Sequence, residues 1–267
     1  MTSLKNLMSL KGRRALITGA NGGLGRTIAD TLGELGADLL LVDKPGANMT
    51  DFASDLTERW SISVKCIVCD LELESDRIDL ISSVQEDNLG LNILVNNAAF
   101  VGASKLTGWV DNFEKQSLET WRRAFEVNLT AVFHLCQAFT SELKASDGGN
   151  IINIASIYGE FGPDWRLYTG ANMGNPAAYS ASKGGLIQLT RWLATTIAPD
   201  VRVNSISPGG IFRNQPQDFV EKYSSRTPLG RMASEEDFQG AVAFLASDLS
   251  SYVTGQILRV DGGWGEW

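Results

Sequence analysis

Short apolar runs alternate with amphipathic segments along the whole chain. The runs that predict strands lie at 15–17, 39–42, 62–69, 93–95, 151–154, 201–206 and 257–260. The segments that predict helices lie at 24–35, 52–60, 78–84, 118–143, 179–198 and 238–246. Continuous apolar runs are typical of strands buried on both faces of a parallel sheet. The pattern predicts an α/β protein with a doubly wound, seven-stranded parallel sheet and helices on both faces, in three α/β/α layers.

Two stretches, 157–177 and 210–228, interrupt this regular alternation. Both are rich in Gly, Pro, Asn and aromatic residues, and both follow the carboxyl end of a predicted strand. Ligands bind at that edge of an open α/β sheet, so we expect the two stretches to be substrate-loop insertions. For 157–177 a surface or subunit-contact insertion is the alternative. Because no Pro/Ser-rich linker interrupts the chain, we expect one domain, 1–267.

Composition excludes some partners. The 267 residues carry a formal net charge of −8, which disfavours nucleic acid because binding of phosphate backbones needs a basic surface. No apolar run approaches the roughly 20 residues needed to cross a bilayer, so we expect no membrane partner. Three cysteines, an odd number, disfavour a disulfide framework and favour the cytoplasm. Cys66 and Cys69 point to opposite faces of a predicted strand, which disfavours a metal or redox site. We expect no bound metal.

A glycine-rich loop connects the first predicted strand to the first predicted helix. It reads Thr-Gly-Ala-Asn-Gly-Gly-Leu-Gly over residues 18–25. Gly19 permits a tight turn, Gly23 allows the backbone to approach a pyrophosphate, and Gly25 allows close packing of helix on strand. The phosphates would lie at the helix N-terminus, whose free N–H groups favour anions. The position of the loop favours a nucleotide-binding, Rossmann-like fold over an ordinary turn.

Asp43 ends the second predicted strand and bears on the choice of cofactor. A carboxylate at this position can accept hydrogen bonds from the adenosine ribose and repels a 2′-phosphate, so we expect NAD rather than NADP. Lys44 leaves the alternative open, because a lysine beside the ribose could pair with that phosphate.

Tyr179 and Lys183 lie four residues apart at the start of a predicted helix, so they share one helical face. A tyrosine hydroxyl has a pKa of about 10, and a neighbouring ammonium stabilises the phenolate and lowers that pKa. This pairing is suited to acid–base chemistry. Tyr158 and Tyr168 have no lysine four residues later and are weaker candidates.

Together with these motifs, the chain resembles the short-chain dehydrogenase/reductase family over almost its whole length. Further matching segments are Asp70-Leu71, Asn96-Asn97-Ala98-Ala99 (with Ala99 where the family usually has glycine), Asn128, Ser156 after 152–155, Pro208-Gly209, 253–256 and 260–263. In the family, the residues matching Asn128, Ser156, Tyr179 and Lys183 are catalytic. The resemblance assigns cofactor binding to Gly19, Asn21, Gly23, Leu24, Asp43, Asp70, Leu71, Asn97, Ala98, Tyr179, Lys183, Pro208, Gly209 and Ile211.

The resemblance also implies how the catalytic residues act. Tyr179 exchanges a proton with the substrate oxygen, and Ser156 donates a hydrogen bond to the same oxygen. Lys183 lowers the pKa of Tyr179 and holds the nicotinamide ribose. Asn128 positions a water that continues the proton relay past Lys183.

The chain departs from the family pattern at two places near the expected substrate. The segment between Ser156 and Tyr179 is longer than usual and carries Trp165, Arg166 and Tyr168. Arg213 stands where the family usually has Thr, and it could contact a cofactor phosphate, clamp an anionic substrate or face solvent. The candidate substrate residues are Ser156, Trp165, Arg166, Tyr168 and Arg213.

The resemblance predicts a homo-oligomer, a tetramer or a dimer, in which the tail with Trp264 and Trp267 meets a neighbouring subunit. His134, the only histidine, lies in an apolar helical stretch and is interpreted as a core or interface residue.

These observations predict an oxidoreductase that transfers hydride between a nicotinamide cofactor and a hydroxyl or carbonyl of a small polar substrate: a polyol, a sugar or a sugar derivative. The nearest alternative is an NADP-dependent reductase of 3-oxoacyl thioesters or other carbonyl compounds. A non-catalytic nucleotide-sensing protein on the same fold is the third hypothesis.

Overall fold

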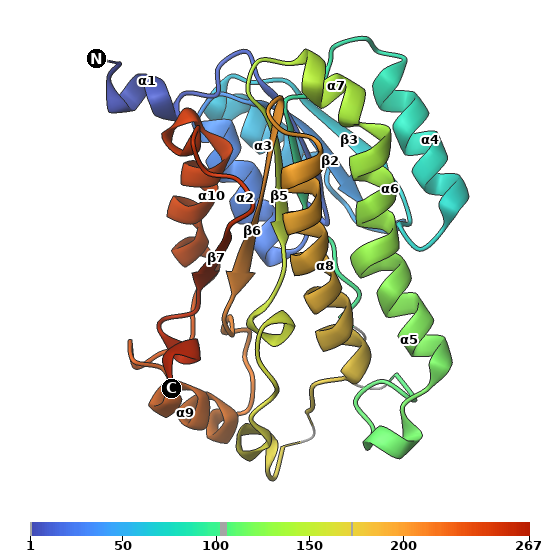
Figure 1. The fold of residues 1–267 in the computed structure, drawn as a ribbon, viewed down its shortest axis with the longest axis vertical. Coiled ribbons are helices and arrows are strands. Elements are labelled where there is room, and N and C mark those ends of the chain that lie inside the picture. Colours follow the sequence, from blue (N-terminus) through green and yellow to red (C-terminus); the bar gives the residue numbers. More distant parts are fainter. Residues whose placement is uncertain (1, 102–105, 172) are drawn as a thin grey trace.

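The computed structural model describes residues 2–101, 106–171 and 173–267, and its strands form one parallel sheet (Figure 1). The strands are β1 (Arg14–Thr18), β2 (Asp38–Asp43), β3 (Val64–Val68), β4 (Ile93–Asn96), β5 (Gly149–Ile154), β6 (Val201–Pro208) and β7 (Ile257–Val260). Their order across the sheet is β3-β2-β1-β4-β5-β6-β7. The order reverses between β1 and β4, so the predicted doubly wound topology is confirmed, and the sheet edge beside these strands is where a ligand is expected.

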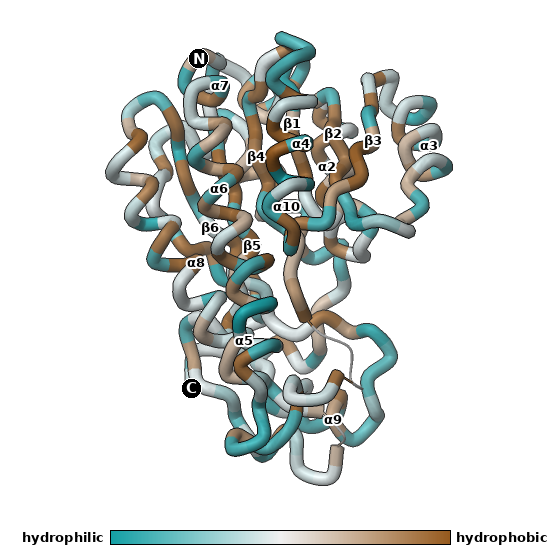
Figure 2. Tube along the Cα trace, turned by 90° about the vertical axis from the view of Figure 1, so that its right-hand side faces the viewer, coloured by the Kyte–Doolittle hydropathy of each residue, from teal (hydrophilic) through white to brown (hydrophobic). Residues whose placement is uncertain are grey.

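Helices cover both faces of the sheet. The α-helices are α1 (Leu4–Met8), α2 (Gly23–Glu34), α3 (Thr50–Trp60), α4 (Glu74–Gln85), α5 (Leu118–Phe125), α6 (Ala131–Ala138), α7 (Thr140–Ala145), α8 (Ala177–Thr196), α9 (Gln217–Arg226) and α10 (Gln239–Ala246). One face packs against α2, α3 and α10 and the other against α4, α6, α7 and α8, giving two hydrophobic cores. The strands form the hydrophobic centre of the chain in Figure 2.

The burial of the strands differs from the prediction at both edges of the sheet. β1, β4 and β5 are buried throughout, as expected. In β3, by contrast, Lys65, Cys66 and Val68 are exposed, because β3 is an outer strand and pairs only with β2. In β7, the other outer strand, no residue is fully buried and Arg259 is exposed. Cys66 is exposed and Cys69, just beyond the strand, is buried, so the two thiols do not face each other.

The predicted long helix over 118–143 is interrupted. α5 ends at Phe125, a π-helical segment spans Glu126–Thr130, and α6 and α7 follow with a break at Phe139. A π-helical segment widens one turn of a helix and changes the direction of its side chains, and such segments occur often at functional sites. Asn128 lies in this segment and is fully buried.

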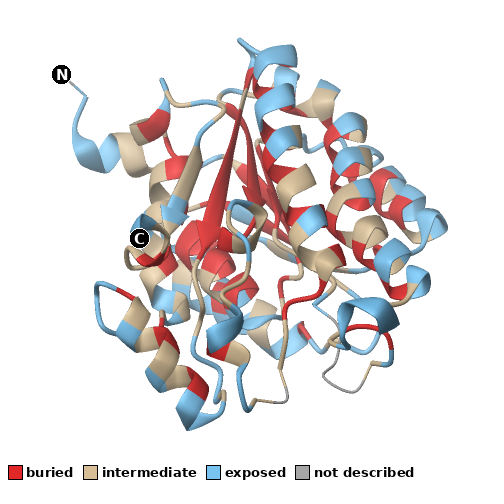
Figure 3. Cartoon of the chain, turned by 60° about the horizontal axis from the view of Figure 1, so that its bottom comes forward, coloured by how far each residue is buried: buried red, intermediate tan, exposed pale blue. Residues whose placement is uncertain are grey.

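The two insertions form a small hydrophobic cluster of their own. They lie at the end of the molecule that comes forward in Figure 3, where buried segments alternate with exposed ones. Ile157 and Leu167 of the first insertion pack with Phe219 and Tyr223 of α9. The sequence pattern did not predict helix α9. Trp264 of the C-terminal tail is 1% exposed and completes the cluster. Trp264 is thus buried within its own chain, whereas Trp267 is exposed, and contact of the tail with a neighbouring subunit stays a prediction.

Within the part of the chain that the structure describes, no helix is both long and apolar enough to cross a bilayer. Over the same residues, no group of three or more His, Cys, Asp or Glu side chains is arranged to hold a metal ion.

Candidate active site

A cavity of about 910 Å³ lies at the carboxyl ends of the strands, beside the point where the strand order reverses. The residues assigned to cofactor binding all line it: Gly19, Asn21, Gly23, Leu24, Asp43, Asp70, Leu71, Asn97, Ala98, Tyr179, Lys183, Pro208, Gly209 and Ile211. Ser156 and Arg213 line it as well. The fold therefore brings together residues that come from six strand ends and from the first turns of α8.

The glycine loop is held by the segment that follows β4. The Asn97 side-chain amide donates to the Thr18 and Gly19 carbonyl oxygens at 2.9 and 3.0 Å, and the Thr18 hydroxyl accepts from the Asn97 and Ala98 N–H groups. Gly19 has a φ of +64°, and a Cβ there would lie 2.8 Å from the Ala98 Cα. Glycine is thus required at position 19 both by the backbone conformation and by this close approach.

The start of α2 fits a dinucleotide phosphate. α2 begins after Gly22 without any side-chain cap, so the N–H groups of its first turn are available to an anion. Gly22 and Gly23 are both exposed at the cavity, and no side chain of the loop shields the backbone there. These residues are therefore compatible with a bound pyrophosphate.

Asp43 is fixed at the end of β2. One of its carboxylate oxygens accepts from the Asn21 N–H and the other from the Lys44 N–H, both at 2.8 Å. The carboxylate thus ties the strand end to the glycine loop and places a negative charge on the cavity wall. Lys44 also lines the cavity.

Arg213 extends across the cavity toward the same loop. Its guanidinium lies 3.0 Å from a carboxylate oxygen of Glu235, and that oxygen is next to Gly23, because a Cβ on Gly23 would lie 2.6 Å from it. The Arg213 side chain is half exposed, so its guanidinium is open both to solvent and to a ligand bound in the cavity. Contact with a cofactor phosphate, clamping of an anionic substrate and exposure to solvent all stay predictions for Arg213, which lines the cavity and is half exposed.

Tyr179, Lys183 and Ser156 converge on the cavity. The Lys183 ammonium is 2% exposed, donates to the Ile154 carbonyl oxygen at 2.6 Å and lies 6.0 Å from the centre of the Tyr179 ring. Burial raises the pKa of Tyr179, and the Ser156 hydroxyl and the positive charge of Arg213 counteract part of this rise. Burial also lowers the pKa of Lys183 to about 8. In this arrangement, the positive charge that lowers the pKa of Tyr179 is that of Arg213, and the lowering by Lys183 that the resemblance implies stays a prediction.

The lowered pKa of Lys183 predicts a pH-dependent stability. The pKa is about 8 in the folded chain and about 10.4 in an unfolded one, so between these values the folded state binds fewer protons and its stability rises with pH. Lys183→Met removes the titration. We expect the stability of the wild type to gain about 3 kcal/mol relative to Lys183→Met between pH 8 and pH 10.5, measured by urea unfolding.

The matched control is Lys5→Met, which replaces an exposed lysine on α1. Its stability difference from the wild type should stay constant over the same range. A constant difference for Lys183→Met as well would contradict the buried, readily discharged ammonium.

Asn128 does not line the cavity. Its side-chain oxygen accepts from the Phe100 N–H at 2.6 Å, and its side-chain nitrogen donates to the Ser182 hydroxyl at 3.0 Å. Ser182 in turn donates to the Tyr179 carbonyl oxygen at 2.9 Å. Asn128 thus ties the segment after β4 to the first turns of α8, which is a positioning contact for Tyr179. Its implied role in holding a water beside Lys183 stays a prediction.

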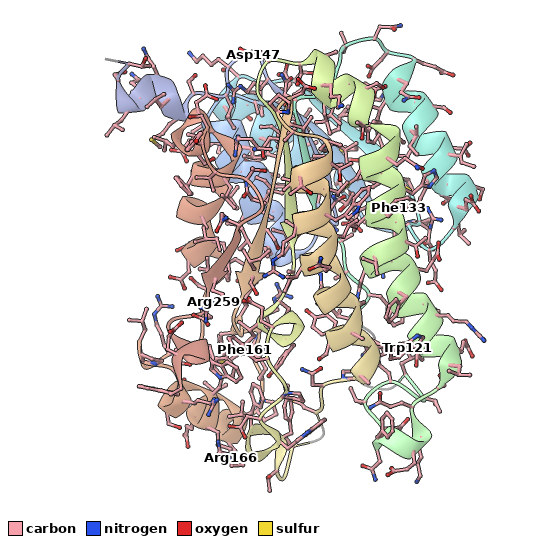
Figure 4. The ribbon with its side chains drawn as sticks, in the orientation of Figure 1. Trp121, Phe133, Asp147, Phe161, Arg166 and Arg259 are labelled. Atoms are coloured by element: carbon pink, nitrogen blue, oxygen red, sulfur yellow. The ribbon has the colours of Figure 1, made fainter. Side chains whose placement is uncertain are left out.

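The insertion residues separate into two groups. Trp165 and Tyr168 line a second cavity instead of the first. Arg166 lines neither, because its exposed guanidinium makes a two-pronged ion pair with Asp164 and points away from the sheet at the lower end of the molecule (Figure 4). The expectation that Arg166 contacts substrate is not supported by its position. Arg166 lies outside both cavities because its guanidinium pairs with the carboxylate of Asp164, two residues earlier in the chain.

Sequence reasoning missed Arg123 and Phe100 on the cavity wall. The Arg123 guanidinium stacks on the Phe100 ring, 4.9 Å from its centre, and bonds both carboxylate oxygens of Glu72 at 2.6 and 3.1 Å. The three residues come from α5 and from the segments after β4 and β3. None of the three residues belongs to a recognisable motif in its own segment. The sequence therefore contained no signal that predicts their contact.

His134 is half-buried and has a hydrogen-bond partner on α4. The Arg77 guanidinium donates to its Nδ1 at 3.3 Å and also pairs with Glu126. The histidine lies on α6 and does not line the cavity.

Comparison with known proteins agrees with this geometry. The sequence profile of the family described as Enoyl-(Acyl carrier protein) reductase matches residues 19–265. A 3-oxoacyl-[acyl-carrier-protein] reductase from Aquifex aeolicus is 31% identical over 96% of the chain and 98% of its own length. An NADP-dependent mannitol dehydrogenase from Alternaria alternata is 31% identical over 98% and 96%. The crystal structure of a short-chain type dehydrogenase/reductase from Mycobacterium marinum superposes with a TM-score of 0.86 at 29% identity, covering 98% of this chain and 99% of that one.

Proposed function

Because the chain belongs to the short-chain dehydrogenase/reductase family, we propose that it is an oxidoreductase that transfers hydride between a nicotinamide cofactor and a hydroxyl or carbonyl of a small polar substrate. The observation that carries the proposal is the convergence of Tyr179, Ser156 and Lys183 on the cavity that also contains the glycine loop. A polyol, a sugar or a sugar derivative is the favoured substrate, and the similarity to a mannitol dehydrogenase supports this class. The whole chain acts as one catalytic domain.

The side chains of the cavity supply the proton chemistry. Tyr179, whose pKa is raised by burial, holds its proton at neutral pH and gives it to the substrate oxygen during reduction. The Ser156 hydroxyl, 6% exposed on the cavity wall, donates a hydrogen bond to the same oxygen and stabilises its developing charge. The Lys183 ammonium lies 6.0 Å from the centre of the Tyr179 ring and places a positive charge beside it. When bound, the nicotinamide ring supplies or accepts the hydride.

The cofactor would be held by three parts of the cavity. The N-terminus of α2 with Gly22 and Gly23 holds the phosphates, Asp43 holds the adenosine ribose, and Asp70 with Leu71 borders the adenine. Lys183 would bind the nicotinamide ribose.

We propose NAD as the preferred cofactor, because the Asp43 carboxylate, fixed by two N–H groups, would repel a 2′-phosphate. Titration with NADH and with NADPH, followed by tryptophan fluorescence, should show at least about tenfold tighter binding of NADH. Asp43→Asn keeps an oxygen that can accept from Asn21 but removes the charge. We expect it to erase most of the preference by strengthening NADPH binding.

Asp51→Asn, which neutralises an exposed carboxylate outside the cavity on α3, is the control and should leave both affinities unchanged. Tighter binding of NADPH by the wild type would overturn the preference and assign the 2′-phosphate to Lys44 or Arg213. Binding of neither nucleotide would overturn the proposed function.

The similarity to a 3-oxoacyl-[acyl-carrier-protein] reductase favours a second candidate, an NADP-dependent reductase of 3-oxoacyl thioesters. A substrate panel separates the two: polyols and sugar derivatives with NAD⁺ on one side, and an acetoacetyl thioester with NADPH on the other. Turnover confined to the thioester would replace the main proposal.

A homo-oligomer, a tetramer or a dimer in the cytoplasm, is also part of the proposal. Support comes from large side chains that remain exposed on the outer face of α5 and α6, where Trp121 is 38% and Phe133 is 45% exposed (Figure 4). Apolar side chains grouped on one surface are a common mark of a protein interface.

A further inference from the structure

A second cavity of about 900 Å³ lies between the two chain segments 110–116 and 163–180. It shares none of its lining residues with the cofactor cavity, and it exists because the segment between Ser156 and Tyr179 is long. The Ala177 N–H donates to the Gln116 side-chain oxygen at 3.0 Å, which joins the two walls at the start of α8. We call this cavity the insertion groove.

Aromatic side chains lie on both walls of the insertion groove. Phe113 is 77% exposed and Trp165 is 58% exposed, although a hydrophobic cluster that could have buried such rings lies close by in the same insertion. Trp165 packs against Tyr168 with ring centres 5.7 Å apart, which fixes its orientation. Large rings that are held in place but left open provide flat apolar surfaces for a ligand.

A buried amide supplies polar recognition. Asn175 lines the groove and is 6% exposed. Its side-chain oxygen accepts from the Ser180 hydroxyl at 2.9 Å, but its Nδ2 has no hydrogen-bond partner within the described residues. A buried donor without an acceptor is destabilising, so a ligand that brings an oxygen to this nitrogen removes that penalty.

The charges of the groove exclude other ligand classes. Among the described lining residues there is no Lys, Arg or His, whereas Asp111 and Glu114 are both present. An anionic ligand would therefore be repelled. A quaternary ammonium would satisfy the aromatic rings but not the Asn175 Nδ2, which needs an acceptor. A neutral ring that carries hydroxyl groups satisfies both, because its C–H face stacks on the aromatic rings and its oxygens accept hydrogen bonds.

We propose that the insertion groove binds a neutral, hydroxylated six-membered ring, a pyranose, stacked on Trp165 and Phe113 and hydrogen-bonded to Asn175. The first turn of α8 separates this groove from the cofactor cavity, since Ala177 and Ser180 line the groove and Tyr179 lines the cavity. The Tyr168 hydroxyl also lies 2.7 Å from that of Tyr158, which links the groove to the segment following Ser156. Because the groove and the cofactor cavity lie on either side of the first turn of α8, the ring is assigned as the distal part of the substrate, an assignment that rests on the proposed function.

The first test uses methyl β-D-glucopyranoside, which has no free carbonyl, and measures binding to the full chain by saturation-transfer NMR and calorimetry. We expect binding by the wild type that weakens at least about tenfold in Trp165→Ala and in Phe113→Ala, two exposed positions where substitution should not disturb folding. Tyr252→Ala, which removes a fully exposed ring outside the groove, should bind as the wild type does.

Absence of binding, or equal affinity in Trp165→Ala and the wild type, would overturn the groove assignment. Tighter binding of choline or of D-gluconate than of the glucoside would overturn the ligand class. None of these outcomes depends on the nicotinamide cofactor, so they are distinguishable from a failure of the NADH titration.

The second test compares sorbitol with maltitol, which is sorbitol carrying one additional glucose ring. If the groove holds the distal ring, Trp165→Ala raises the KM for maltitol at least about fivefold and leaves its kcat and both constants for sorbitol unchanged. Equal effects on both polyols would overturn the distal-ring assignment. If the wild type turns over neither sorbitol nor maltitol, the assignment of the groove to the distal ring of a polyol substrate is overturned. The glucoside experiment decides separately whether the groove binds a pyranose.

Discussion

Replacing Tyr179 with Phe should reduce kcat at least about 1,000-fold while leaving the affinity for the nicotinamide cofactor within about twofold of the wild type. The substitution removes only the hydroxyl that exchanges a proton with the substrate oxygen. The ring remains in place, because it packs with the small cluster around Trp109 and Ala178. Single-turnover measurements together with a fluorescence titration of the cofactor separate the two effects.

Two other tyrosines provide controls for this experiment. Tyr252→Phe removes a hydroxyl that is fully exposed and should leave kcat unchanged. Tyr158→Phe removes a part-buried hydroxyl that bonds Tyr168 and belongs to a residue that does not line the cavity. We expect a loss below about tenfold. A larger loss for Tyr158→Phe than for Tyr179→Phe would transfer the acid–base role to Tyr158.

Replacing Gly25 with Ala should have the largest effect on folding and cofactor binding. A Cβ at this position would clash with the Gly19 carbonyl oxygen and lie 2.9 Å from the Ala20 Cα. Both are backbone atoms of the glycine loop, and Asn97 holds that loop from the other side, so no flexible side chain can move away. We expect a loss of about 3 kcal/mol or more of unfolding free energy and at least about tenfold weaker NADH binding.

Gly240→Ala is the matched control, because Gly240 lies in α10 with open space around it. Alanine favours a helix over glycine, so this variant should be as stable as the wild type or up to about 1 kcal/mol more stable. Thermal unfolding and the NADH titration measure both properties. If Gly25→Ala behaves like Gly240→Ala, the glycine loop does not pack as the structure indicates.

The order of strands and helices could be predicted from the sequence because it depends on local patterns. Apolar runs such as 39–42 and 151–154 have no conformation that buries them as well as a central strand does. The same logic failed for β3, because the sequence does not state which strand lies at the edge of the sheet. It also failed for 118–143, where the continuous apolar pattern gave no indication of the π-helical segment around Asn128.

The cofactor cavity was predictable because its residues occupy fixed places relative to strand ends. A residue that directly follows a parallel strand must lie at the ligand edge of the sheet, so Gly19, Asp43 and Asn97 meet without further information. The Tyr179–Lys183 spacing is likewise a property of one helix.

Only the tertiary structure decided the contacts between segments that have no fixed spacing. Arg166 was assigned to substrate on its chemistry, yet it pairs with Asp164. The burial of Trp264 in the cluster formed by the two insertions could not be read from the sequence either. The insertion groove depends on how two irregular segments fold against each other. The sequence by itself thus determined the elements that regular hydrogen bonding and hydrophobic burial dictate. Packing decided the side-chain partners in the irregular segments, because many arrangements of such segments satisfy the backbone hydrogen-bonding groups equally well.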